Sequence, residues 1–220
     1  MRLQEKKHQK IRYITVTGML SAVSAVLMMV SFSVPLMPSF IKLDISEMPA
    51  LIAAFSMGPL SGVMVCLIKN LINVCFTTTG GVGELSNFLL GCSLVLPAGL
   101  CYKFRKNRKM ALIGSLAGAA AMALMSLPLN YFVTYPIYAK LMPLEAIIGM
   151  YQAIAPSVDG LFRCLLVFNV PFTFVKGALD AAITFLIYKP LSPILHGRAG
   201  AEKKPDETKA GESETPINNS

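Results

Sequence analysis

Long blocks of apolar residues, rather than amphipathic stripes, constrain this chain most. Five blocks stand out, at 14–30, 60–76, 85–102, 110–133 and 171–188. Each is long enough, or nearly so, to cross a hydrocarbon core of about 30 Å at about 1.5 Å per helical residue. Because 54% of the residues are hydrophobic and only 15% are charged, we predict an all-α integral membrane protein.

Positive charges predict the orientation. They gather in three places: the segment 2–12, the stretch KFRKNRK at 103–109, and the end of the chain from Lys189 onward. Loops rich in Lys and Arg stay on the cytoplasmic side of a membrane. Both termini are therefore predicted to be cytoplasmic, and an even number of crossings must separate each basic cluster from the next.

Three of the apolar blocks lie between 12 and 103. Because both ends of this interval are predicted to be cytoplasmic, the number of crossings must be even, and a fourth crossing is needed. The stretch SEMPALIAAFS provides it, as a short helix over 47–57 with Asp44 or Ser46 as its N-cap and Glu47 in its first turn. The preceding loop, 33–46, is predicted to lie on the outer side and to re-enter the bundle. Its charges then need not face lipid.

The predicted architecture is a single six-helix membrane domain over 1–196. Its helices are expected at about 12–32, 47–57, 59–76, 84–103, 110–139 and 170–189. The segment 140–169 is too long for an idle loop and is predicted to form one or two interfacial helices on the outside. The polar tail, 197–220, is expected to be disordered in the cytoplasm.

Motifs for catalysis are absent from the sequence. It contains no P-loop, no HExxH and no GxSxG, and its two histidines, His8 and His196, lie near the two ends of the chain. The five cysteines show no CxxC spacing, so no metal is expected. The basic clusters lack the interleaved aromatic residues of a nucleic-acid site. An intramembrane enzyme using Lys176 and Asp180 remains the alternative from another class.

Three stretches resemble the riboflavin-specific, substrate-binding S subunits of energy-coupling factor (ECF) vitamin importers. They are PSFIKLDISEMPALIAAFSMGPLSGVMVCLIKNLINV, GELSNFLLG and VPFTFVKGALDAAITFLIYKPLSPIL. The resemblance extends over about 10–196. It implies a six-helix, multi-pass protein of a bacterial plasma membrane that captures riboflavin at its outer face and works with a transmembrane coupling subunit and two cytoplasmic ATPases. An S subunit for a different vitamin is the nearest alternative.

Riboflavin has a flat apolar tricycle, a pyrimidine-dione edge and a polyhydroxyl ribityl chain, so its site needs an apolar slot with a few placed polar groups. The candidate ligand-binding residues are Met37 and Phe40 for the ring, Asn130, Thr173 and Lys176 for the dione edge, Thr79 and Gly80 for the ribityl chain, and Asp44. Riboflavin is then the transported ligand, and no cofactor is expected.

Several of these residues have structural alternatives. A lysine inside a membrane helix is costly, so Lys176 is expected to contact the ligand, to pair with Asp180 four residues on, or to do both. Asn130 could instead bond a neighbouring helix. Family members tend to carry PFN where this chain has PFT, so Thr173 leaves the detailed dione contact open. Lys69 is expected to pair with Asp44, Glu47 or Glu84 across the bundle.

A stripe of small residues on the first helix suggests a partner surface. Gly18 and Ala22, and likewise Ser21 and Ala25, are spaced four residues apart, which permits close approach of another helix. In the resembled family such a stripe contacts the coupling subunit. Packing inside the chain itself is the alternative.

Overall fold

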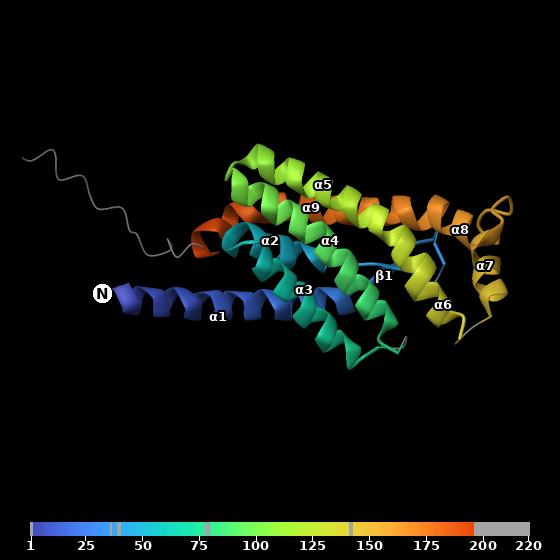
Figure 1. Cartoon of the computed structure of the whole chain (residues 1–220), viewed down its shortest axis with the longest axis horizontal. Coiled ribbons are helices and arrows are strands. Elements are labelled where there is room, and N and C mark those ends of the chain that lie inside the picture. Colours follow the sequence, from blue (N-terminus) through green and yellow to red (C-terminus); the bar gives the residue numbers. More distant parts are fainter. Residues whose placement is uncertain (1, 36, 39–40, 78–79, 141–142, 196–220) are drawn as a thin grey trace, which may run out of the picture.

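Helices form nearly all of the part of the chain that the computed structural model describes, residues 2–35, 37–38, 41–77, 80–140 and 143–195 (Figure 1). They are α1 (Arg2–Met29), α2 (Glu47–Met57), α3 (Pro59–Val74), α4 (Val82–Phe104), α5 (Arg108–Leu129), the π-helix η1 (Asn130–Thr134), α6 (Tyr135–Tyr138), α7 (Leu144–Gln152), α8 (Gly160–Cys164), the π-helix η2 (Leu165–Asn169) and α9 (Val170–Leu195). An antiparallel hairpin of β1 (Phe32–Ser33) and β2 (Lys42–Leu43) stands where the sequence predicted only a loop.

Within the described part of the chain, four helical stretches are long and apolar enough to cross a membrane: Lys10–Met29, Val82–Phe104, Arg108–Tyr138 and Gly160–Ile187. Their outer surfaces carry exposed large apolar side chains, as a lipid-facing surface requires. The two helices α2 and α3 have 11 and 16 residues, shorter than the ~20 residues that span a bilayer. The described structure thus confirms a mostly helical membrane protein, while six crossings stay a prediction.

The shortest of these helices, α2, lies at the centre of the bundle. It packs against α1, α3, α4 and α9, and its residues from Glu47 through Phe55 are all buried. Its bounds coincide with those expected from the sequence. A helix buried on all sides must be apolar on all sides, which explains why SEMPALIAAFS shows no amphipathic pattern.

In the described residues, two π-helical turns, η1 and η2, interrupt the long helices, and a proline accounts for each. Pro136 and Pro171 lack the amide that would bond the carbonyl four residues earlier, that of Phe132 in η1 and Val167 in η2. A freed carbonyl inside an α-helix favours a wider turn at that point. The prolines therefore place a wide turn in each of the two helices, and both turns contribute residues to the cavity described below.

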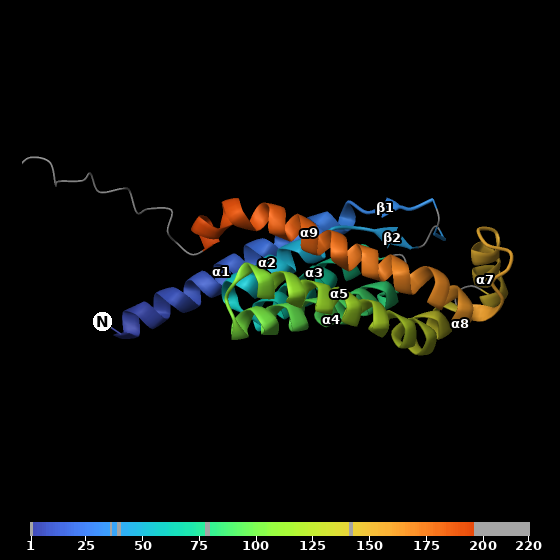
Figure 2. The same ribbon diagram turned by 90° about the horizontal axis from the view of Figure 1, so that it is seen from above.

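The two ends of the molecule are formed by different elements. The start of α1, the α4–α5 junction and the end of α9 share one end of the bundle, and β1, α6, α7 and α8 occupy the other half (Figures 1 and 2). The basic segments 2–12 and 103–109 thus lie at the same end. Of the one or two helices expected over 140–169, α7 is found as a separate helix among the described residues, whereas residues 160–169 continue into α9, so the last helix begins about ten residues earlier than expected. The tail, 197–220, lies outside the described residues.

The close packing of α4 on α5 provides a test of this arrangement. A Cβ atom at Gly118 would lie 2.2 Å from the backbone oxygen of Leu94. We therefore expect Gly118→Ala to destabilise the protein by about 1–3 kcal/mol. Gly149→Ala is the control, because a Cβ atom there meets nothing within 4 Å. Thermal unfolding in detergent measures both, and equal melting temperatures would contradict the helix contact.

Candidate functional site

A cavity of about 480 Å³ opens in the half of the bundle that is remote from the basic segments. The ends of α1 and α3, the hairpin, the start of α4, the length from η1 to α6, and the region from η2 into α9 all contribute to its wall. Small-molecule sites commonly have volumes of roughly 300–1,000 Å³. The cavity is therefore large enough for a vitamin-sized ligand.

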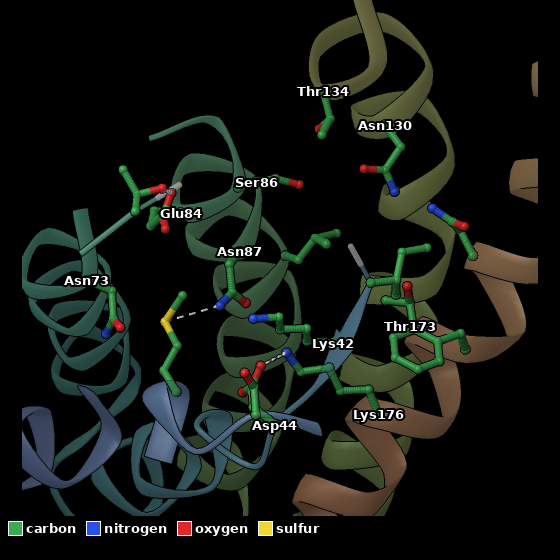
Figure 3. Close-up of a pocket in the computed structure, with 18 of the residues that line it drawn as sticks. Lys42, Asp44, Asn73, Glu84, Ser86, Asn87, Asn130, Thr134, Thr173 and Lys176 are labelled. Carbon is green, nitrogen blue, oxygen red and sulfur yellow. Dashed lines mark hydrogen bonds and ion pairs between the residues drawn. The ribbon is translucent and has the colours of Figure 1, made fainter. Parts of the chain in front are cut away.

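The structure brings half of the predicted ligand-binding residues together. Asp44, Asn130, Thr173 and Lys176 come from three separate parts of the chain and line the same cavity (Figure 3). Met37 is half-buried and Gly80 is exposed, and neither is among the lining residues. Phe40 and Thr79 lie outside the described residues.

Lys176 is held by a residue distant in sequence. Its Nζ donates to Oδ2 of Asp44 at 2.8 Å, and both side chains are more than nine-tenths buried. The alternative pairing with Asp180 is wrong, because the hairpin brings Asp44 to the ammonium from 132 residues away. Periodicity along one helix cannot predict such a contact. Figure 3 shows this pair at one side of the cavity.

Asp44 is ionised at any ordinary pH. Burial opposes its ionisation, but the positive charges of Lys176 and Lys69 and hydrogen bonds from Lys176 and Ser46 outweigh burial, and its pKa falls from 3.8 to about 2. The lowered pKa means that Asp44 stabilises the folded state above pH 3.8 and loses that effect as the pH falls toward 2. Between pH 5 and 8 its charge does not change.

A second ion pair lies deeper, between α3 and α2. The ammonium of Lys69 donates to Oε1 of Glu47 at 2.5 Å and to the hydroxyl of Ser46 at 2.7 Å, and neither charged side chain is exposed. This confirms the expectation that Lys69 finds a carboxylate across the bundle. Gly91 of α4 leaves room for Glu47, since a Cβ atom there would lie 2.7 Å from its carboxylate.

Asp180 differs from the other buried carboxylates. It is fully buried, and among the described residues neither of its oxygens has a hydrogen-bond donor. Unpaired buried carboxylates are costly. Substitution of Asp180 therefore breaks no hydrogen bond to a described residue, whereas substitution of Asp44 removes the acceptor of Lys176 and Ser46.

Asn130 and Thr173 face the cavity without partners of their own. Neither side chain makes a hydrogen bond within the described part of the chain, although both are less than one-tenth exposed. The bond to a neighbouring helix considered for Asn130 is thus not found among those residues. Their polar atoms are available to a ligand.

Sequence reasoning missed most of a polar rim across the cavity. Its members, which come from the end of α3 and the start of α4, are Asn73, Thr77, Glu84, Ser86 and Asn87. Thr77 donates to Glu84 at 2.8 Å. The spacing of these residues resembles the polar face of an ordinary helix, so only the approach of the two helix ends shows that they share a site. Thr134 and Asn169 were missed as well, although each lies in a π turn that a nearby proline signals.

The small-residue stripe on α1 divides into two halves. Gly18 and Ala22 are exposed, and a Cβ atom at Gly18 would meet nothing within 4 Å. Ser21 and Ala25 are buried inside the chain, where the Ala25 carbonyl accepts a hydrogen bond from Asn73. The second pair therefore packs internally and cannot form part of a surface for a partner.

The chain is similar in sequence and in fold to known membrane transporters. The family model described as ECF transporter, substrate-specific component matches residues 12–188. The riboflavin transporter RibU of Staphylococcus aureus is 34% identical over 85% of this chain and 93% of its own length, and the riboflavin transporter FmnP of Bacillus subtilis is 29% identical over 87% and 98%. A solved structure of the S component of a bacterial ECF transporter superposes with a TM-score of 0.67 at 32% identity, covering 85% of this chain and 98% of that one. These relatives are transporters and not enzymes, as the sequence predicts.

The pairing of Lys176 with Asp44 generates a stability test. Lys176→Met alone strands the Asp44 carboxylate and should cost about 3–5 kcal/mol, because one partner of a buried pair is lost. The double variant Lys176→Met with Asp44→Asn should recover most of that loss. Lys176→Met with Asp180→Asn is the matched control and should recover little, because Asp180 does not bond Lys176. Unfolding in detergent at pH 7 measures all three variants, and recovery in the Asp180→Asn double variant instead of the Asp44→Asn double variant would contradict the assignment.

Proposed function

Because the chain belongs to the family of ECF transporter substrate-specific components, we propose that it binds riboflavin at the outer face of a bacterial plasma membrane for an ATP-driven importer. A transmembrane coupling subunit and two cytoplasmic ATPases complete the importer. The observation that carries the proposal is the cavity, which lies at the end of the bundle remote from the basic segments. It combines an apolar wall with the Asn130 amide and the Thr173 hydroxyl, which have no partner among the described residues.

The chemistry of riboflavin matches the distribution of groups around the cavity. Phe172, Leu90 and Phe76 supply apolar surface for the tricycle. Asn130 and Thr173 supply unengaged polar atoms for the dione edge. The rim formed by the ends of α3 and α4 supplies amide, hydroxyl and carboxylate groups, which suit the hydroxyls of a ribityl chain. This rim replaces Thr79 and Gly80 as our proposed ribityl site.

Lys176 can bind ligand and Asp44 at the same time. An ammonium group carries three donors, and Asp44 engages one of them. The rest of the group faces the cavity, because Lys176 is one of its lining residues. A donor that is already charged and fixed by a carboxylate forms a strong bond to a carbonyl oxygen at little entropic cost. We therefore assign Lys176 to a dione carbonyl and Asp44 to holding Lys176 in place.

The proposed topology has six crossings with both termini in the cytoplasm. The shared position of the basic segments at one end of the bundle supports it, since such segments remain on the cytoplasmic side. The short helices α2 and α3 count as two of the six. Their shortness is tolerable for α2 because the surrounding helices shield it from lipid.

The coupling subunit is proposed to contact the exposed part of α1. Gly18 and Ala22 are two exposed small residues one turn apart in the second half of that helix, where a partner helix can approach closely. Ser21 and Ala25 no longer belong to the proposal because they are buried. This surface lies apart from the cavity, so docking and ligand binding are separable.

The central test is binding without transport. We expect the purified full chain to bind one riboflavin and to quench its fluorescence. Liposomes containing the chain alone should accumulate no riboflavin beyond the bound amount, because the sequence has no nucleotide site. Liposomes that also contain a coupling subunit and ATPases should accumulate it when ATP is supplied. Uphill uptake by the chain alone, or a folded chain that binds no flavin, would overturn the proposal.

The docking surface has its own test. Gly18→Leu and Ala22→Leu should abolish copurification with the coupling subunit, since a bulky side chain prevents close helix approach, and should leave riboflavin affinity within about twofold. Ala117→Leu is the matched control, because Ala117 is an exposed small residue on α5. Loss of riboflavin affinity in Gly18→Leu would show that α1 packs internally at this position.

A further inference from the structure

Three buried side chains at the outer half of the bundle form a closed ring of hydrogen bonds. The Tyr151 hydroxyl donates to Oδ1 of Asn169 at 2.8 Å, and Nδ2 of Asn169 donates to the Tyr135 hydroxyl at 3.3 Å. The two tyrosine hydroxyls contact each other and close the ring. All three residues are at most 6% exposed. The ring joins α6, η2 and α7, which are separate segments of the chain.

The ring leaves half of the hydrogen-bonding capacity of Asn169 unused. An amide side chain has two N–H donors and two acceptor lone pairs. The tyrosines engage one donor and one lone pair, and no other bond joins the Asn169 side chain to the described residues. Asn169 also lines the cavity. It therefore presents one donor and one acceptor that are already oriented.

The orientation of this amide is set in part from outside the cavity, because Tyr135 lines the cavity and Tyr151 does not. Tyr151 belongs to α7, does not line the cavity and is fully buried, with its ring 5.4 Å from that of Phe168. Asn169 lies in the π turn η2, one helical turn before Thr173. Asn130, in the opposing π turn η1, also lines the cavity. The two π turns thus present one amide each to the same space.

We propose that Asn169 hydrogen-bonds the ligand and that Tyr151 is the positioning residue that directs its amide, so that a helix which does not line the cavity controls ligand specificity. This inference rests on the proposed riboflavin function. The dione edge alternates C=O and N–H groups, and an oriented amide pairs with one of each. Threonine at 173 has a single hydroxyl and cannot make that paired contact alone. Asn169 supplies it.

The test compares riboflavin with 3-methylriboflavin, in which a methyl group replaces the dione N–H. The wild-type chain should bind riboflavin at least tenfold more tightly than the methyl derivative, because the acceptor of the oriented amide is left unpaired. Asn169→Leu removes the amide and should bring the ratio of the two dissociation constants close to one. Tyr151→Phe removes a single oxygen and should lower the ratio about three- to tenfold.

The control and the outcomes separate this inference from the function on which it rests. Tyr102→Phe removes a hydroxyl from α4 outside the cavity lining and should leave the ratio unchanged. If Asn169→Leu does not fold, Tyr151→Phe decides alone, because it keeps every atom of Asn169. A wild-type ratio in folded Tyr151→Phe overturns the inference and leaves the riboflavin function intact. A wild-type chain that binds neither flavin overturns both.

Discussion

The ion pair between Lys69 and Glu47 is the contact on which the rest of the bundle depends, since neither charge is exposed and each would be very costly alone. It fixes the start of α2 against α3. Ser46 joins the same cluster, because its hydroxyl accepts from Lys69 and donates to Asp44. The Ser46 carbonyl accepts from Ser24 of α1. One short stretch at the start of α2 is thus tied to two neighbouring helices.

Hydrogen bonds connect this cluster to the cavity through Asp44. Asp44 accepts from the backbone amide and hydroxyl of Ser46 with one oxygen and from Lys176 with the other. The hairpin that carries Asp44 and the helix that carries Lys176 are therefore joined at the cavity wall. A ligand that contacts Lys176 would contact a side chain whose position is already determined by α2. Such preorganisation lowers the entropic cost of binding.

On the other side of the cavity, prolines and tyrosines determine the positions of the polar side chains. The π turns place Asn130 and Asn169 on its wall, and the ring with Tyr135 and Tyr151 orients one of these amides. Polar groups buried in a membrane bundle are seldom left unpaired. Asn130, Thr173 and Asn169 have hydrogen-bonding capacity that no described residue uses, and all three line one cavity. Buried polar atoms without a described partner also occur outside it, at Asn70, Ser115 and Asp180, so the shared cavity is what marks the first three residues as a binding site.

The sequence by itself determined the membrane class, the bounds of α2 and the need for a carboxylate opposite Lys69, because hydropathy and charge act over short stretches of chain. The predicted side-chain cap of Ser46 is not formed. It also identified Lys176, Asn130, Thr173 and Asp44 as candidates. Only the tertiary structure decided that Lys176 pairs with Asp44 and not Asp180, that Ser21 and Ala25 are buried, and that Asn169 shares a cavity with the ends of α3 and α4. These contacts join residues far apart in sequence, and helix periodicity carries no information about which face meets which neighbour.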